Sequence, residues 1–127
     1  MTNPGALRGR LFGCGGYPIN SHQVESFHRG NLHLRIPPGN FRIPVRKGYQ
    51  IPYRIMLPRQ VEGLLVSLCV SSTHLGYSTL RMEPEYIKMG QAAGAAAHLA
   101  HTKGVTPRKV DVARLQAILC DAGAILQ

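Results

Sequence analysis

The fold of the second half of the chain rests on three short stretches: Ser72-Thr73-His74, Arg81-Met82-Glu83-Pro84 and Gly90-Gln91-Ala92-Ala93-Gly94. They follow the apolar run Leu64-Leu65-Val66-Ser67-Leu68-Cys69-Val70, which has the pattern of a strand covered on both faces. Pro84 suits the first position of a helix, where its missing N–H is no loss. The order predicts a buried strand, a polar loop and a helix from about Pro84 to Lys103, with Gly104 as its left-handed cap.

The start of that helix offers a binding place for an electron-rich group. The first turn of a helix leaves amide N–H groups without intrahelical partners, and the helix dipole adds about half a positive charge there. Arg81 precedes this turn and would add a full positive charge. Spacing alone favours an ion pair of Arg81 with Glu83 or Glu85, so both roles of this arginine stay open.

Two further features near this helix have a structural and a functional interpretation. His74 lies in the expected loop and could act as an acid, a base or a partner of a ring edge, although a single histidine is more often held by backbone carbonyls. Gly90, Gly94 and Ala97 fall on one face of the helix, and each interior glycine costs roughly 1 kcal/mol relative to alanine. Something is therefore expected to pass close to this face, either a neighbouring element or a cofactor.

The first half of the chain is rich in glycine and proline and predicts short, irregular strands. Residues 32–36 and 41–45 alternate apolar with other side chains around the turn Pro37-Pro38-Gly39-Asn40, so the pair could form a hairpin in which Pro44 restricts its strand to an edge. Residues 49–58 are a β-biased run bracketed by prolines. Residues 1–31 read mainly as loop.

A short amphipathic helix is expected at the end of the chain. Asp111 is a suitable N-cap, residues 112–122 carry an apolar stripe, and Gly123 would end the helix. The 127-residue chain therefore predicts a single α+β domain. Its β-rich part covers residues 1–60, and residues 61–127 form a strand, a loop, a long helix and the terminal helix.

Composition narrows the classes of partner. The chain has 15 Lys and Arg against 6 Asp and Glu, so its net charge of +9 attracts anions such as nucleic acid or a cofactor diphosphate. The basic residues are scattered, and we do not expect nucleic acid as a partner, although a small basic module that binds polyanions stays open as an alternative. No apolar window is long enough to span a membrane, so no membrane association is expected.

The cysteines and histidines predict neither a disulfide framework nor a metal site. Cys14, Cys69 and Cys120 are widely spaced and odd in number. We expect Cys69 and Cys120 to be buried as small apolar residues, in a protein of the reducing cytoplasm. His98 and His101 have no further ligands at fitting spacing, so no bound metal is expected.

Several motifs occur in one order along the chain, and together they resemble a known family. They are Gly16-Tyr17-Pro18-Ile19-Asn20-Ser21-His22, Ile51-Pro52-Tyr53-Arg54 with Leu57-Pro58, Gly63-Leu64-Leu65-Val66, Ser71-Ser72-Thr73-His74, Arg81-Met82-Glu83-Pro84 and Gly90-Gln91-Ala92-Ala93-Gly94. Over roughly residues 14–126 this order is similar to the C-terminal part of the FAD-dependent oxidoreductase family, some members of which are labelled xanthan lyase. The resemblance implies hydride transfer between a small organic substrate and FAD.

The resemblance also implies roles for particular residues. The positions implied to contact FAD are Ser72, Thr73, His74, Arg81, Met82, Glu83, Gln91 and Gly94. The loop before the helix would lie beside the isoalloxazine ring, and the backbone of Met82 and Glu83 would face the pyrimidine edge of that ring. Tyr53 and Arg54 would line the substrate side. His74 and Arg81 are the catalytic candidates.

One part of the family pattern has no counterpart in this sequence. Family members open with a strand, a glycine fingerprint and a helix that hold the FAD diphosphate. Here Gly13-Cys14-Gly15-Gly16 runs into Tyr17-Pro18, and Pro18 stands in the place of the third glycine. We therefore expect a C-terminal fragment, one partial domain of an α/β, Rossmann-like FAD-binding oxidoreductase, which supplies the flavin-facing half of the site and is inactive alone. An upstream dinucleotide-binding chain or domain is the expected partner, and a degenerate remnant without activity is the remaining alternative.

Overall fold

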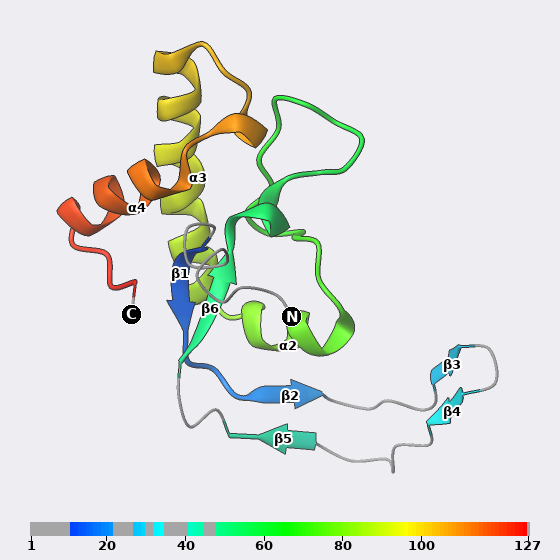
Figure 1. Cartoon of the computed structure of the whole chain (residues 1–127). Helices are drawn as coiled ribbons and strands as arrows, with labels where there is room; N and C mark the ends of the chain where they lie inside the picture. The colour runs from blue at the N-terminus through cyan, green and yellow to red at the C-terminus, as the bar shows by residue number, and fades with distance from the viewer. Residues whose placement is uncertain (1–10, 22–26, 30–31, 35–40, 45–47, 127) are drawn as a thin grey trace, which may run out of the picture.

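The computed structural model describes residues 11–21, 27–29, 32–34, 41–44 and 48–126. Short strands occupy the first part of the chain and helices the second (Figure 1). The strands are β1 (Leu11–Gly15), β2 (Ile19–Ser21), β3 (Phe27–Arg29), β4 (Leu32–Leu34), β5 (Phe41–Ile43) and β6 (Tyr49–Pro52). The helices are the 3-10 turns η1 (Tyr53–Met56) and η2 (Pro107–Lys109) and the α-helices α2 (His74–Leu80), α3 (Glu83–Lys103) and α4 (Val112–Asp121). The predicted α+β class is confirmed.

Within the described residues, the strands form three separate antiparallel ribbons. β1 pairs with β6, β2 with β5, and β3 with β4. The register of β1 shifts between Leu11 and Gly13, where the strand bulges. Figure 1 shows the β1–β6 ribbon beside α3, the β2–β5 ribbon below α2, and the β3–β4 ribbon farthest from the helices.

The predicted hairpin of residues 32–36 with residues 41–45 is wrong. β4 pairs with β3 and β5 pairs with β2, so neither strand meets the other. The alternating pattern correctly marked extended backbone at both places, but it carries no information about which strand lies opposite. β1, β2 and β3 fall among residues that we expected to be mainly loop.

The hydrophobic core lies between the β1–β6 ribbon and the helices α3 and α4. α3 contributes Met89, Ala92 and Ala96, and α4 contributes Leu115, all with 0% exposure. Small side chains on α3 let neighbouring elements approach the helix backbone closely. The other buried apolar side chains are Phe12, Ile51, Tyr53, Met56, Val70, Leu80, Leu99, Ala100, Val110 and Leu119.

The ends of the two longer helices agree with the sequence prediction. Gly104 has a left-handed φ of 61°, and its N–H donates to the carbonyls of Ala100 and His101. The Asp111 carboxylate accepts a hydrogen bond of 2.9 Å from the Ala113 N–H at the start of α4. Both predicted caps are confirmed.

Residues 64–70 do not form the predicted buried strand. Leu64 and Leu68 are 45% and 55% exposed. The backbone is held near η1, where the Val66 N–H donates to the Met56 carbonyl at 2.9 Å. A strand with apolar residues on both faces needs neighbouring strands and covering layers, and the described residues provide neither beside this segment.

The burial predicted for two cysteines is also wrong. Cys69 is exposed because its segment is not a covered strand, and Cys120 is exposed on the outer side of α4. Cys14 is half-buried, and all three cysteines are free thiols. Of the helices in the described part of the chain, none has the length and apolar character to cross a membrane.

Candidate functional site

Six of the eight predicted cofactor residues lie at the two ends of α2, and the other two, Gln91 and Gly94, lie within α3. Ser72 and Thr73 precede this helix and His74 is its first residue, so the expected loop is largely helical. Arg81 ends α2, and Met82 is the N-cap of α3. The 7 residues of α2 separate the two groups. At 1.5 Å of rise per residue this amounts to about 10 Å along the helix axis.

The first end of α2 is an open, well-ordered turn. The Thr73 side chain caps the helix by accepting a hydrogen bond of 3.1 Å from the Gly76 N–H. The Ser72 hydroxyl donates to the Thr73 carbonyl at 3.1 Å. Ser72, Thr73 and His74 are all exposed, so a ligand at this turn has direct access to them.

The first turn of α3 lacks a side-chain cap. Met82 has extended backbone, and its side chain accepts no hydrogen bond from the turn that follows it. The Glu85 and Tyr86 N–H groups both donate to the Met82 carbonyl. An uncapped first turn keeps its positive end for an outside acceptor.

Arg81 sits beside this uncapped turn and is itself incompletely paired. Its Nε atom is buried and has no hydrogen-bond partner among the described residues. The ion pair of Arg81 with Glu83 or Glu85, which the spacing favours, is not formed among the described residues. Glu85 lies 3.9 Å from the Lys88 ammonium instead, and Glu83 is exposed and forms no ion pair in this part of the chain. A buried donor without a partner costs about 1–3 kcal/mol, so an acceptor is missing at this point.

Two tyrosines tie α2 to the start of α3. The hydroxyl groups of Tyr77 and Tyr86 lie 2.8 Å apart, within hydrogen-bond distance. Desolvation, and then this hydrogen bond, raise the pKa of Tyr86 to about 12. The sequence analysis missed this contact because the helix break between the two residues removes any periodic spacing that would signal it.

One face of α3 is uncovered. A Cβ atom added at Gly90 or Gly94 would meet nothing within 4 Å, and Ile87 is 71% exposed. The neighbour that these glycines predict is therefore absent from the described residues. A solvent-facing helix side normally carries polar residues, whereas this face carries small and apolar ones.

The two residues expected on the substrate side differ in their surroundings. Tyr53 is 3% exposed, and its hydroxyl donates to the Pro107 carbonyl at 2.9 Å. Burial raises the pKa of Tyr53 to about 12. Arg54 is exposed. Tyr53 thus packs η1 against η2 and has no open face toward a substrate, whereas Arg54 has one.

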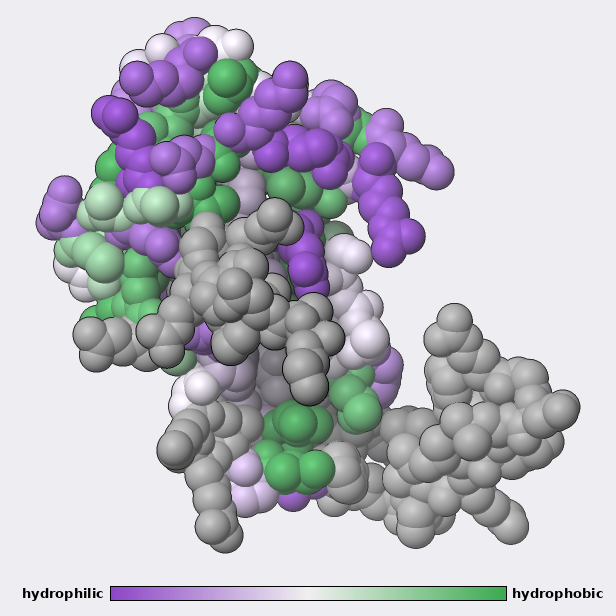
Figure 2. Space-filling model, viewed as in Figure 1, coloured by the Kyte–Doolittle hydropathy of each residue, from purple (hydrophilic) through white to green (hydrophobic). Residues whose placement is uncertain are grey.

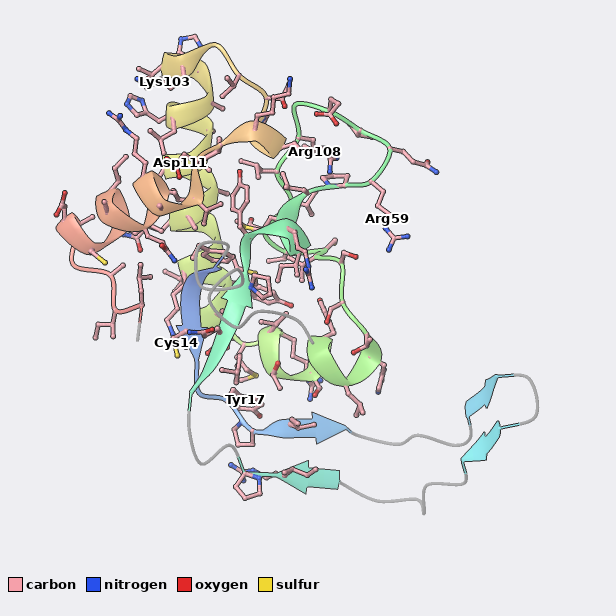
Figure 3. All side chains as sticks on the ribbon, in the orientation of Figure 1. Cys14, Tyr17, Arg59, Lys103, Arg108 and Asp111 are labelled. Carbon is pink, nitrogen blue, oxygen red and sulfur yellow. The ribbon has the colours of Figure 1, made fainter. Side chains whose placement is uncertain are left out.

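A cavity of about 500 Å³ lies between β1, α3 and the segment after α4. Of the predicted cofactor residues, only Gln91 lines it. Figure 3 shows Cys14, which also lines the cavity, on β1 beside α3. The complete lining is Phe12, Gly13, Cys14, Gly15, Gly16, Gly48, Lys88, Gln91, Leu119, Gly123, Ala124, Ile125 and Leu126.

Basic side chains gather at the other end of α3. Lys103, Lys109 and Arg114 line a hollow of about 260 Å³ together with Asp111 and apolar side chains. Figure 2 shows this end of the molecule as mainly hydrophilic. The nearby Arg108 is neutralised by Glu62, with 2.7 Å between Nε and Oε1. The described residues contain no group of three or more His, Cys, Asp or Glu arranged to hold a metal ion.

The comparisons with known proteins give one match. Residues 11–119 match the model of the family described as FAD dependent oxidoreductase. No curated protein and no solved structure matches the chain. The matched range includes both ends of α2, the first turn of α3 and its uncovered face. FAD is thus the cofactor that the family implies for the complete protein, and this chain belongs to the FAD dependent oxidoreductase family.

Proposed function

We propose that this chain supplies the flavin-facing wall of an FAD-dependent oxidoreductase. The observation that carries the proposal is the Nε of Arg81, which is buried and has no hydrogen-bond partner among the described residues, beside a helix start that the Met82 side chain does not cap. Both features present positive charge to one place, and such charge stabilises the negative charge that a reduced flavin carries near its N1 and C2 carbonyl. FAD, when bound, would supply the hydride chemistry.

The residues around α2 would then have distinct tasks. Arg81 would donate to the pyrimidine edge of the ring together with the amides of Met82 and Glu83. At the other end of α2, the exposed turn of residues 72–74 would contact the ring system, and His74 would hold or accept a proton there. Arg54, exposed on η1, would face an anionic or polar substrate. Tyr53 has no place in this proposal because its hydroxyl is bound to Pro107.

The described residues fit only one part of FAD. A dinucleotide cradle needs a strand, a glycine turn and a helix in that order. Here the glycines of β1 are followed by β2, and among the described residues the first helical element after Gly16 is η1 at Tyr53. We infer that a separate dinucleotide-binding segment or chain holds the adenine and the diphosphate, and that it covers the open face of α3 near Gly90 and Gly94.

A titration of the chain with FMN and FAD tests both parts of this proposal. Amide chemical shifts are measured by NMR in the purified, isotopically labelled protein. FMN should shift the amides of residues 72–74, 81–83, 85 and 86. FAD should bind no more tightly than FMN, because the described residues offer no cradle for the adenine and the diphosphate. Arg81→Met should remove the shifts, Arg81→Lys should retain part of them, and Arg114→Met, a basic residue near the other end of α3, should leave them unchanged.

Two outcomes would contradict the proposal. If FMN shifts no amide near Arg81, the flavin-facing role is wrong. If FAD binds stoichiometrically and far more tightly than FMN, the chain holds its own dinucleotide-binding part, and the inferred separate segment is wrong.

A further inference from the structure

The cavity beside Cys14 has the properties of a second binding site, separate from the groups at the two ends of α2. We propose that it binds a small carboxylic acid with an apolar body. Its volume of about 500 Å³ lies within the range of small-molecule sites, about 300–1,000 Å³. Such sites combine mostly apolar walls with a few convergent polar groups.

The apolar wall is formed by a reversal of the chain after α4. Gly123 has a left-handed φ of 84°, and the Ala124 N–H donates back to the Leu119 carbonyl at 2.8 Å. This turn brings residues 124–126 to the cavity opposite the buried side chain of Phe12. The body of a ligand would therefore replace water against apolar surface on two sides.

The polar side of the cavity carries one cation and one amide. The Lys88 ammonium donates to the Cys14 carbonyl at 3.0 Å, which fixes it at the cavity. The Glu85 carboxylate lies 3.9 Å from this ammonium, too far for a hydrogen bond. An ammonium has three donors, so Lys88 retains capacity for a ligand. Gln91 lines the same cavity, and its carboxamide has no hydrogen bond within the described residues.

These two groups select a carboxylate over a neutral ligand. A carboxylate presents two acceptor oxygens, and hydrogen bonds from a charged donor are roughly twice as strong as neutral ones. The net charge of +9 on the chain also favours an anion. A neutral alcohol of the same length would bury the same apolar surface but would gain only an uncharged hydrogen bond.

Two glycines at the ends of the β1–β6 ribbon, Gly16 and Gly48, line the cavity. Gly48 and Cys14 both line the cavity, and a Cβ atom added at Gly48 would lie 2.6 Å from the Cys14 sulfur. A Cβ atom added at Gly16 would meet nothing within 4 Å, because this position borders open space. Cys14 is half-buried there, whereas Cys69 and Cys120 are exposed. The rate at which the Cys14 thiol reacts with an alkylating agent should therefore show whether a ligand occupies the cavity.

Protection of Cys14 from alkylation tests the proposal. The purified chain is treated with iodoacetamide at increasing decanoate, and the modification of each cysteine is followed by peptide mass spectrometry, with Cys69 and Cys120 as internal references. Decanoate at ten times its Kd should slow alkylation of Cys14 about tenfold, since the free fraction follows mass action. Decan-1-ol is the matched neutral probe and should protect much less.

Variants of Lys88 distinguish the effect of its charge on ligand binding from any effect of the substitution on folding. Lys88→Gln keeps a donor for the Cys14 carbonyl but removes the charge, and it should lose most of the protection by decanoate. Lys88→Arg should retain the protection. Circular dichroism checks that each variant is folded. The FMN shifts near Arg81 should persist in Lys88→Gln, so failure of this site is distinguishable from failure of the flavin proposal.

Three outcomes would overturn the proposal. One is equal protection by decanol and decanoate. Another is unchanged protection in the folded Lys88→Gln variant. The third is parallel slowing at all three cysteines, which would indicate non-specific association rather than a site.

Discussion

The two sides of α3 differ in what lies against them. On one side Met89, Ala92 and Ala96 are completely buried against the β1–β6 ribbon and α4. On the other side Ile87 is 71% exposed, and no described residue outside α3 lies within 4 Å of a Cβ atom added at Gly90 or Gly94. Both sides carry small and apolar residues, so composition alone does not separate them.

This difference shows that α3 carries a second face suited to packing, for which the described residues supply no partner. The packed side has partners within the chain, whereas no described residue outside α3 lies within 4 Å of a Cβ atom added at Gly90 or Gly94. Leu64 and Leu68, in the segment that we expected to be a strand, are exposed as well. Exposed apolar patches of this kind mark interaction surfaces. If contacts decide stability here, substitutions on the packed side should lower the free energy of unfolding more than substitutions on the open side.

The largest expected effect comes from the core. Leu115→Ala should lower the free energy of unfolding by about 2–5 kcal/mol, because it leaves a cavity at a site with 0% exposure. Ile87→Ala, on the open side, should change it by no more than about 0.5 kcal/mol. Urea unfolding measures both. A comparable loss in the two variants would show that the open side is covered in solution.

The stability of the packed side should also depend on pH through Tyr53. Burial raises its pKa from 10.0 to about 12, so the folded state holds the phenolic proton more tightly than the unfolded state. The stabilisation is complete below pH 10 and is lost as the pH rises from about 10 through 12, by up to about 3 kcal/mol.

Tyr53→Phe should lack this part of the pH dependence. Urea midpoints between pH 8 and pH 11.5 are measured for both proteins, and their difference isolates Tyr53 from the other tyrosines. Parallel pH profiles would contradict the buried placement of this hydroxyl.

The two helix caps should behave differently because they lie in differently packed regions. Asp111→Ala removes the cap of α4, which packs in the core, and should lower global stability by about 1 kcal/mol. Thr73→Ala removes the cap of the short α2 and should mainly speed amide exchange within that helix. Asp111→Asn and Thr73→Ser are the conservative controls. Equal global losses would show that α2 unfolds together with the core.

The smallest effects are expected at the glycines of the open face. Gly90→Ala and Gly94→Ala should each stabilise the chain by about 0.5–1 kcal/mol, since alanine favours the helix and its Cβ meets no neighbour. Ala96→Gly, on the packed side, should destabilise it by a similar amount or more. Thermal unfolding gives the sign in each case. Destabilisation by Gly90→Ala would reveal a neighbour close to this face.

Local signals in the sequence predicted local structure well. Gly104 and Asp111 mark the ends of α3 and α4 because a left-handed cap and an N-cap each depend on a few adjacent residues. Residues 64–70 show the opposite case. Their apolar run is typical of a buried strand. A strand is buried only when neighbouring strands and covering layers lie against it, and the local sequence does not show whether these exist.

The sequence indicated which residues belong to the candidate site better than it indicated how they are arranged in space. The motif order placed Arg81 and Met82 at a helix start, as the structure does. It did not reveal that α2 separates them from His74, because the sequence of α2 has no strong helix signal beyond its Thr73 cap. Nor did it place Lys88 against Cys14, since that contact joins residues 74 positions apart.

The bond from Lys88 to the Cys14 carbonyl has a consequence for self-association. Among the described residues the β1–β6 ribbon has two strands, so each strand has one side without a ladder partner there. Unpaired N–H and C=O groups along such edges can pair with a strand of another chain. By occupying a main-chain acceptor of β1 with a charged, partly hydrated amine, the lysine removes one of the contacts on which an intruding strand would depend and discourages fibre-like stacking through that edge.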